Sequence, residues 1–190
     1  METILSVLIG IGLSAASGFR VFVPLLGLSI ASMTGALGVS GDFAWVGSVP
    51  ALIAFSAATA AEVGAYYVPW IDNALDTIAS PLAVISGVVV SLSVYADMTP
   101  FLRWSLAIIA GGGIAGLVQA GTVAMRAASS GTTAGFGNFI VASVEFIGAI
   151  ATTILAIVLP VVCAICLFAA GLIFFNKYNK RKAAEKISSS

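Results

Sequence analysis

Four charged side chains lie inside apolar stretches long enough to cross a membrane, and they constrain the fold more than any other feature. They are Arg20, Glu62, Arg126 and Glu145, two basic and two acidic. An ionised group in hydrocarbon costs roughly a few kcal/mol or more, so such residues usually pair, face the interior of a helix bundle and mark a site or pathway. We therefore expect these four charges to form an electrically neutral, functional set within the membrane.

The composition predicts an integral membrane protein. Of 190 residues, 60% are hydrophobic and 8% charged, whereas a soluble domain carries about 25% charged residues. A membrane helix needs about 20 mostly apolar residues, so the chain holds enough for five or six crossings. We expect an all-α, polytopic helical membrane protein with about six transmembrane crossings, including broken helices. Residues 1–176 form its single transmembrane domain, and residues 177–190 form a basic cytoplasmic tail.

The first apolar stretch, residues 3–38, is too long for one simple crossing. It would measure about 54 Å as one helix, and it contains Gly18 and Pro24. Glycine adds flexibility, and proline removes a backbone hydrogen bond. We expect the helix to break between Ser17 and Pro24 near the middle of the membrane, where the freed backbone groups face protein or water.

The remaining crossings are predicted from the positions of proline and of loop residues. A loop over residues 35–48 carries Trp45 as an interfacial anchor, and the second span covers residues 50–67. A short amphipathic helix at the interface over residues 69–78 precedes the third span, residues 81–96. The fourth span, residues 101–128, ends in a loop over residues 129–137. Pro160 divides residues 138–176 either into two spans or into one kinked span containing a half-length element.

The basic end of the chain predicts its orientation. Lys177, Lys180, Arg181, Lys182 and Lys186 follow the last apolar residues, and the positive-inside rule then places the C-terminus in the cytoplasm. With six crossings the N-terminus would lie on the same side. We expect a multi-pass protein of the bacterial inner membrane. Equal numbers of acidic and basic residues argue against nucleic-acid binding.

Two helices each present a narrow polar face around one of the charges. Helical spacing places Gln119 with Arg126 on one face, and Asn138 with Glu145 on another. These faces either line a shared cavity or pack closely against neighbouring helices through small residues. A weak internal repeat, Arg20 then Glu62 and Arg126 then Glu145, resembles the repeats of transporters whose sites lie at the repeat interface.

These residue types favour transport. Arginine binds carboxylate and phosphate through its planar fork of donors, and a buried glutamate can take up and release a proton. We expect a small transporter or channel-like protein for a small anion or a proton-coupled solute. The pathway would use Arg20, Glu62, Gln119, Arg126, Asn138 and Glu145. The alternative is an accessory or scaffold subunit whose charge pairs fix helix register. The expected surroundings are the lipid bilayer, with a homo-oligomer or a larger membrane complex left open.

Other chemistry has little support in the sequence. Histidine is absent, which removes the usual general base and the commonest metal ligand, so we expect neither an enzyme nor a cofactor or metal site. Cys163 and Cys166 lie in an apolar helix, where buried thiols are inert. Asp72, Asn73 and Asp76 suit a solvated polar face better than a cation site.

The segment from Ala16 to Leu26, with Ser17-Gly18-Phe19-Arg20 at its centre, resembles the opening motif of a family of small bacterial integral membrane proteins catalogued as a domain of unknown function. Glu62, Asn138 and Glu145 also lie in segments similar to that family, and the likeness covers most of residues 10–150. Tyr66 to Val68 stand where the family typically has a basic residue, and Phe146 stands where it has a further acidic one. The resemblance implies no established activity.

Overall fold

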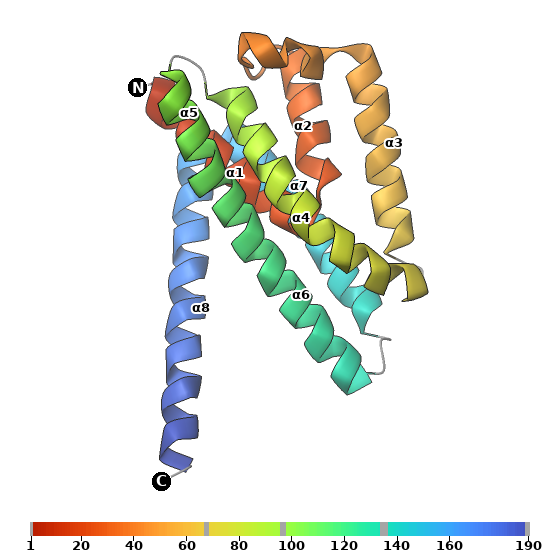
Figure 1. Cartoon of the computed structure of the whole chain (residues 1–190), viewed down its shortest axis with the longest axis vertical. Helices are drawn as coiled ribbons and strands as arrows, with labels where there is room; N and C mark the ends of the chain where they lie inside the picture. The colour runs from red at the N-terminus through yellow and green to blue at the C-terminus, as the bar shows by residue number, and fades with distance from the viewer. Residues whose placement is uncertain (1, 67–68, 96–97, 134–136, 189–190) are drawn as a thin grey trace.

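The computed structural model describes residues 2–66, 69–95, 98–133 and 137–188, with side chains for all of these except residues 2, 69–76, 174 and 178–188. Every regular element in this part of the chain is helical, which confirms the predicted all-α class (Figure 1). In order, the elements are α1 (Glu2–Phe19), α2 (Phe22–Met33), η1 (Gly41–Gly47), α3 (Val49–Ala65), α4 (Pro69–Val94), α5 (Pro100–Leu106), the π-helical η2 (Ala107–Gly112), α6 (Gly113–Thr133), α7 (Asn138–Val158) and α8 (Pro160–Ser188).

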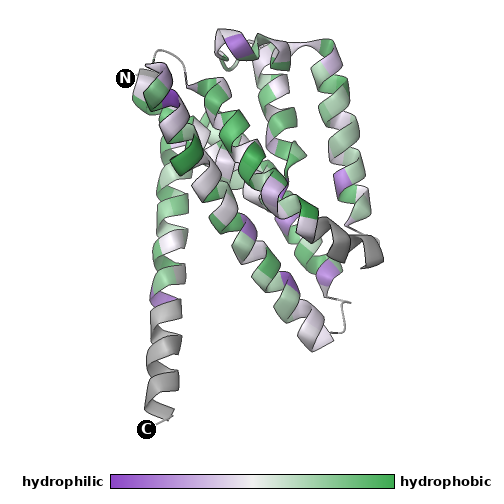
Figure 2. Ribbon diagram, viewed as in Figure 1, coloured by the Kyte–Doolittle hydropathy of each residue, from purple (hydrophilic) through white to green (hydrophobic). Residues whose placement is uncertain are grey.

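Several of these helices are long and apolar enough to cross a membrane, so the chain is a polytopic membrane protein. Four candidate spans qualify on their own: Thr77–Val94, Pro100–Thr133, Asn138–Val158 and Pro160–Lys177. The bent pair η1 and α3, with 66° between its helices, adds a fifth if it counts as one span. Figure 2 shows largely hydrophobic ribbons, with hydrophilic positions isolated along the helices.

The first apolar stretch breaks where the sequence predicts. Helix α1 ends at Phe19 and α2 begins at Phe22, which leaves Arg20 at the break. Pro24 then lies in the first turn of α2. Backbone N–H groups in the first turn have no intrahelical acceptor, so proline, which lacks this group, costs no hydrogen bond there. In Figure 1, α1 runs inward from the N-terminal end and α2 returns to the same end.

This return changes the predicted topology. Because α1 and α2 turn back, they do not make the crossing that the count of about six included, and four or five candidate spans remain. The two chain ends lie at opposite ends of the molecule (Figure 1). The prediction that both termini share one side of the membrane rested on six crossings, and it stays a prediction.

The predicted interfacial helix and third span are one helix, so that prediction is also wrong. Helix α4 continues from Pro69 to Val94 with Pro81 inside it. Membrane helices tolerate an interior proline because neighbouring groups satisfy the freed carbonyl. The predicted polar face with Asp72, Asn73 and Asp76 lies outside the described side chains.

The predicted loop over residues 129–137 begins too early. Helix α6 continues to Thr133, and the hydroxyl of Thr133 donates to Ser129 O at 2.7 Å. Such bonds to the preceding turn let polar residues remain helical. Pro160 separates two helices, α7 and α8, and each is long enough to be a span. The first of the two alternatives for residues 138–176 therefore holds. Helix α8 also runs through the basic tail to Ser188.

The re-entrant helix α1 packs at the centre of the bundle, against α4, α6 and α7. Close packing depends on small residues: a Cβ on Gly18 would lie 2.5 Å from Ala115 O. Serines bond across the α1–α4 interface, with Ser14 Oγ 2.9 Å from Ser91 Oγ and Ser17 Oγ 3.0 Å from Ser86 Oγ. Small and hydroxyl side chains thus hold the break rigidly inside the bundle.

Candidate functional site in the membrane interior

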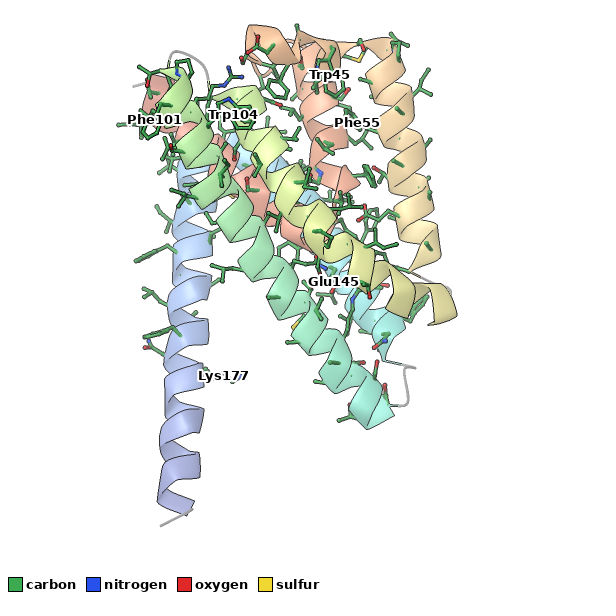
Figure 3. The ribbon with its side chains drawn as sticks, in the orientation of Figure 1. Trp45, Phe55, Phe101, Trp104, Glu145 and Lys177 are labelled. Carbon is green, nitrogen blue, oxygen red and sulfur yellow. The ribbon has the colours of Figure 1, made fainter. Side chains whose placement is uncertain are left out.

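The carboxylate of Glu145 is shared by two arginines. Arg126 Nε donates to Glu145 Oε1 at 3.1 Å, and Arg126 Nη2 bonds Oε2, so the pair is bidentate. Arg20 Nη2 lies 3.4 Å from the same Oε2. This confirms the predicted proximity of Arg20 to one of the two glutamates. Figure 3 shows Glu145 deep in the molecule, away from both ends.

All three side chains are almost fully removed from the surface. Arg20, Arg126 and Glu145 are 2%, 4% and 1% exposed. Buried ion pairs of this kind are sustained only when geometry and further hydrogen bonds compensate the loss of hydration. Arg20 Nη2 obtains one such bond by donating to Ala142 O at 2.9 Å, one turn before Glu145 on α7.

Glu62 serves a different structural purpose from Glu145. Its Oε1 accepts a hydrogen bond from Val21 N at 2.7 Å, and its Oε2 accepts one from Phe22 N at 3.0 Å. These are the first backbone donors of α2, which have no intrahelical partner. A negative charge at this position also complements the helix dipole. Glu62 thus caps the re-entrant helix from α3 while remaining next to the arginines.

Tyr66 belongs to the centre although the residue pattern did not single it out. Its buried ring lies 3.8 Å from the Arg20 guanidinium carbon and 4.0 Å from that of Arg126, measured to the ring centroid. Both distances suit cation–π contacts. The signal in the sequence was its position one helical turn after Glu62, on the same face.

The two remaining predicted residues lie in different surroundings. Gln119 is buried on the inward stripe of α6 together with Ala115, Thr122 and Arg126, as the helical spacing predicts. Asn138 is half-buried at the start of α7, where its Nδ2 donates to Ser130 Oγ at 2.9 Å. It joins the ends of α6 and α7, two turns away from Glu145.

Arg20 retains unused hydrogen-bonding capacity. Among the described residues, its buried Nε and Nη1 have no hydrogen-bond partner. An unpartnered buried donor is expensive, and more so when it is charged. The side chain can therefore accept a further ligand without losing an existing bond.

A cavity of about 390 Å³ reaches one side of the centre. Glu62 and Tyr66 are its polar lining residues, and neither arginine nor Glu145 lines it. The other lining residues are apolar and come from the break before α2 and from α2, α3 and α4: Val21, Phe22, Ala58, Ala61, Ala65, Ile78, Ala79 and Leu82.

Another ion pair lies outside the centre, and the residue pattern did not indicate it. Arg103 Nη1 lies 3.1 Å from Asp42 Oδ2, and Arg103 Nη2 donates to Leu92 O at 2.8 Å. It connects η1, the end of α4 and α5. Asp42 is 79% exposed, so this ion pair links helices at the surface of the bundle and not in its interior.

The described side chains contain no group of three His, Cys, Asp or Glu residues that could hold a metal ion. Cys163 and Cys166 are free thiols, the first buried and the second exposed.

A family model described as a domain of unknown function (DUF4126) matches residues 7–180. Neither the curated proteins nor the solved structures gave a match to the chain. The match includes every residue of the buried centre and the cavity.

Proposed function

Because the chain belongs to the DUF4126 family, whose description assigns no activity, we propose from the geometry of the centre that it is a small membrane transporter for an anion, coupled to protons. The observation that carries this proposal is the sharing of Glu145 by Arg20 and Arg126. Two guanidinium groups share this one carboxylate, so a second negative charge is attracted to them: that of Glu62 when it is ionised, or that of a bound anion when Glu62 is protonated.

The proposed cycle rests on competition between an anion and a carboxylate. In the observed state, the four charges sum to zero when all are ionised, since Glu62 supplies the second negative charge. If Glu62 takes up a proton, the centre carries one net positive charge and can receive an anion. Loss of the proton restores the Glu62 charge and favours release of the anion. Proton and anion thus move together in this cycle.

For its placement, we propose the bacterial inner membrane with a cytoplasmic C-terminus. In Figure 3, Trp45, Phe55, Phe101 and Trp104 gather at one end of the bundle, while Lys177 lies toward the other. Aromatic residues favour the membrane–water interface, and basic residues favour the cytoplasmic side.

Flux measurements in reconstituted vesicles test the proposal. Proteoliposomes are loaded with a pH-sensitive dye, and gradients of chloride, phosphate, succinate or decanesulfonate are imposed in turn. At least one anion should drive a change of internal pH in the wild type. Glu62→Gln should abolish that change, because an amide cannot exchange the proton.

Asp42→Asn is the matched control, since it makes the same chemical change at an exposed carboxylate outside the centre. It should keep the wild-type flux. Absence of flux for all four anions in folded wild-type protein would overturn the proposal.

A second function, that of a scaffold subunit, is favoured by one observation. Arg20, Arg126 and Glu145 are at most 4% exposed and do not line the cavity. A closed, paired centre would fix helix register in a subunit that packs with other membrane proteins. Absence of flux in folded wild-type protein, whatever the stability of Glu145→Gln, would support this function over transport.

A further inference from the structure

The cavity beside the centre has the size and lining of a ligand site. Its volume of about 390 Å³ lies in the range of roughly 300–1,000 Å³ that small-molecule sites occupy. Apolar side chains form most of the lining, and the polar groups, Glu62 and Tyr66, lie on its α3 side. Such a site suits a ligand with an apolar body and one polar head.

The outer rim of the cavity faces the surroundings of the bundle. Ile78 is 57% exposed and Leu82 37% exposed, and both line the cavity from α4. Helix α3 packs mainly on α2 and makes few contacts with α4. In Figure 1 the two helices diverge from their connection. Lipid would cover this apolar rim, so a ligand can reach the cavity sideways from the bilayer.

At the inner side, Tyr66 separates the cavity from the arginines. The residue lines the cavity, and its ring contacts the guanidinium groups of Arg20 and Arg126. The Arg20 guanidinium that contacts this ring has two nitrogens, Nε and Nη1, without a hydrogen-bond partner among the described residues. Movement of this one ring would bring a head group in the cavity next to free guanidinium donors.

We infer that this cavity binds a single-chain amphiphile with an anionic head group, its chain among the apolar residues and its head directed toward Arg20. The inference rests on the proposed anion transport and names its substrate class. The head replaces Glu62 as the counter-charge of the arginines once Glu62 has taken up a proton, so the centre remains neutral. A cationic head would add a third positive charge beside Arg20 and Arg126.

Equilibrium binding to the full-length protein in lipid nanodiscs tests this inference with decanesulfonate as the radiolabelled probe. Three competitors each change one property: decanol lacks the charge, decylamine reverses it, and methanesulfonate lacks the chain. Unlabelled decanesulfonate should displace the probe. The three analogues should compete more than about tenfold less well, because each loses either the charge attraction or the burial of the chain.

Two alanine-to-phenylalanine variants of α3, one inside the cavity and one outside it, test where the probe binds. Ala61→Phe places a ring in the cavity and should weaken binding more than about tenfold. Ala57→Phe makes the same change on the same helix at an exposed position that does not line the cavity, and it should bind as the wild type does. Equal effects of the two variants would overturn the inference, as would equal competition by decanol, decylamine or methanesulfonate.

Binding and flux fail independently, which separates this inference from the proposed function. Selective binding of decanesulfonate without flux of any anion would support the amphiphile site and overturn transport. Flux of chloride, phosphate or succinate without decanesulfonate binding would support transport and overturn the amphiphile site.

Discussion

Glu62 Oε1 accepts a hydrogen bond from Val21 N at 2.7 Å, so a carboxylate on α3 caps the helix that begins at the break in the first apolar stretch. One side chain therefore holds the re-entrant geometry that places Arg20 at the centre of the bundle. The same carboxylate lines the cavity. A change at Glu62 should therefore affect both the stability of the break and the proposed ligand site.

Loss of this cap should destabilise the protein. Glu62→Ala removes the acceptor of two backbone donors, and we expect a cost of about 0.5–2 kcal/mol from the lost cap and more from the unsatisfied buried groups. Glu62→Gln keeps one carbonyl acceptor and should cost less. Thermal unfolding in detergent measures the order, and equal melting temperatures for wild type and Glu62→Ala would contradict the capping role.

The sharing of Glu145 predicts unequal costs for breaking the buried pairs. Arg126→Gln leaves Glu145 with Arg20 as its partner, whereas Glu145→Gln leaves two buried guanidinium groups without their carboxylate. We expect Glu145→Gln to cost about 3–5 kcal/mol and Arg126→Gln to cost less. Unfolding in increasing concentrations of a denaturing detergent measures both. A larger loss for Arg126→Gln would show that Glu145 is not the shared partner.

Tyr66 should stabilise the centre through the contacts of its ring with Arg20 and Arg126. Cation–π contacts contribute about 0.5–2 kcal/mol. Tyr66→Leu keeps an apolar side chain but removes the ring, so it should lower the melting temperature. Tyr66→Phe keeps the ring and should therefore unfold at a higher temperature than Tyr66→Leu. If Phe and Leu variants unfold at the same temperature, the ring contacts with Arg20 and Arg126 contribute nothing measurable.

The close approach of α1 and α6 predicts that one glycine cannot be enlarged. A Cβ on Gly18 would lie 2.5 Å from Ala115 O and 2.6 Å from Val118 Cβ, so Gly18→Ala must push the helices apart. We expect a cost of about 1–3 kcal/mol. The control is Gly148→Ala on α7, where nothing lies within 4 Å of the added Cβ. It should be neutral or stabilising by up to about 1 kcal/mol. Comparable losses in both variants would refute the packing argument.

The class of the protein, the break in the first apolar stretch and the four buried charges of the centre could all be predicted from the sequence. Long apolar runs require helices in a bilayer, because every backbone polar group must be satisfied within the segment. Gly18 and Pro24 predicted the break between α1 and α2, and the cost of isolated charges predicted that Arg20 lies near a glutamate. Each of these conclusions depends on local composition or on the bilayer as a solvent.

The arrangement of these parts followed from contacts in the folded protein and could not be predicted from the sequence. The return of α1 and α2 to one end, the continuity of α4 through Pro81 and the pairing of Arg20 with Glu145 depend on contacts between distant segments. The same is true of Glu62 as a cap and of Tyr66 against two arginines. Local patterns do not encode such contacts, because a broken helix can continue or turn back at similar local cost. Packing of small residues and partners for buried polar groups then select one arrangement.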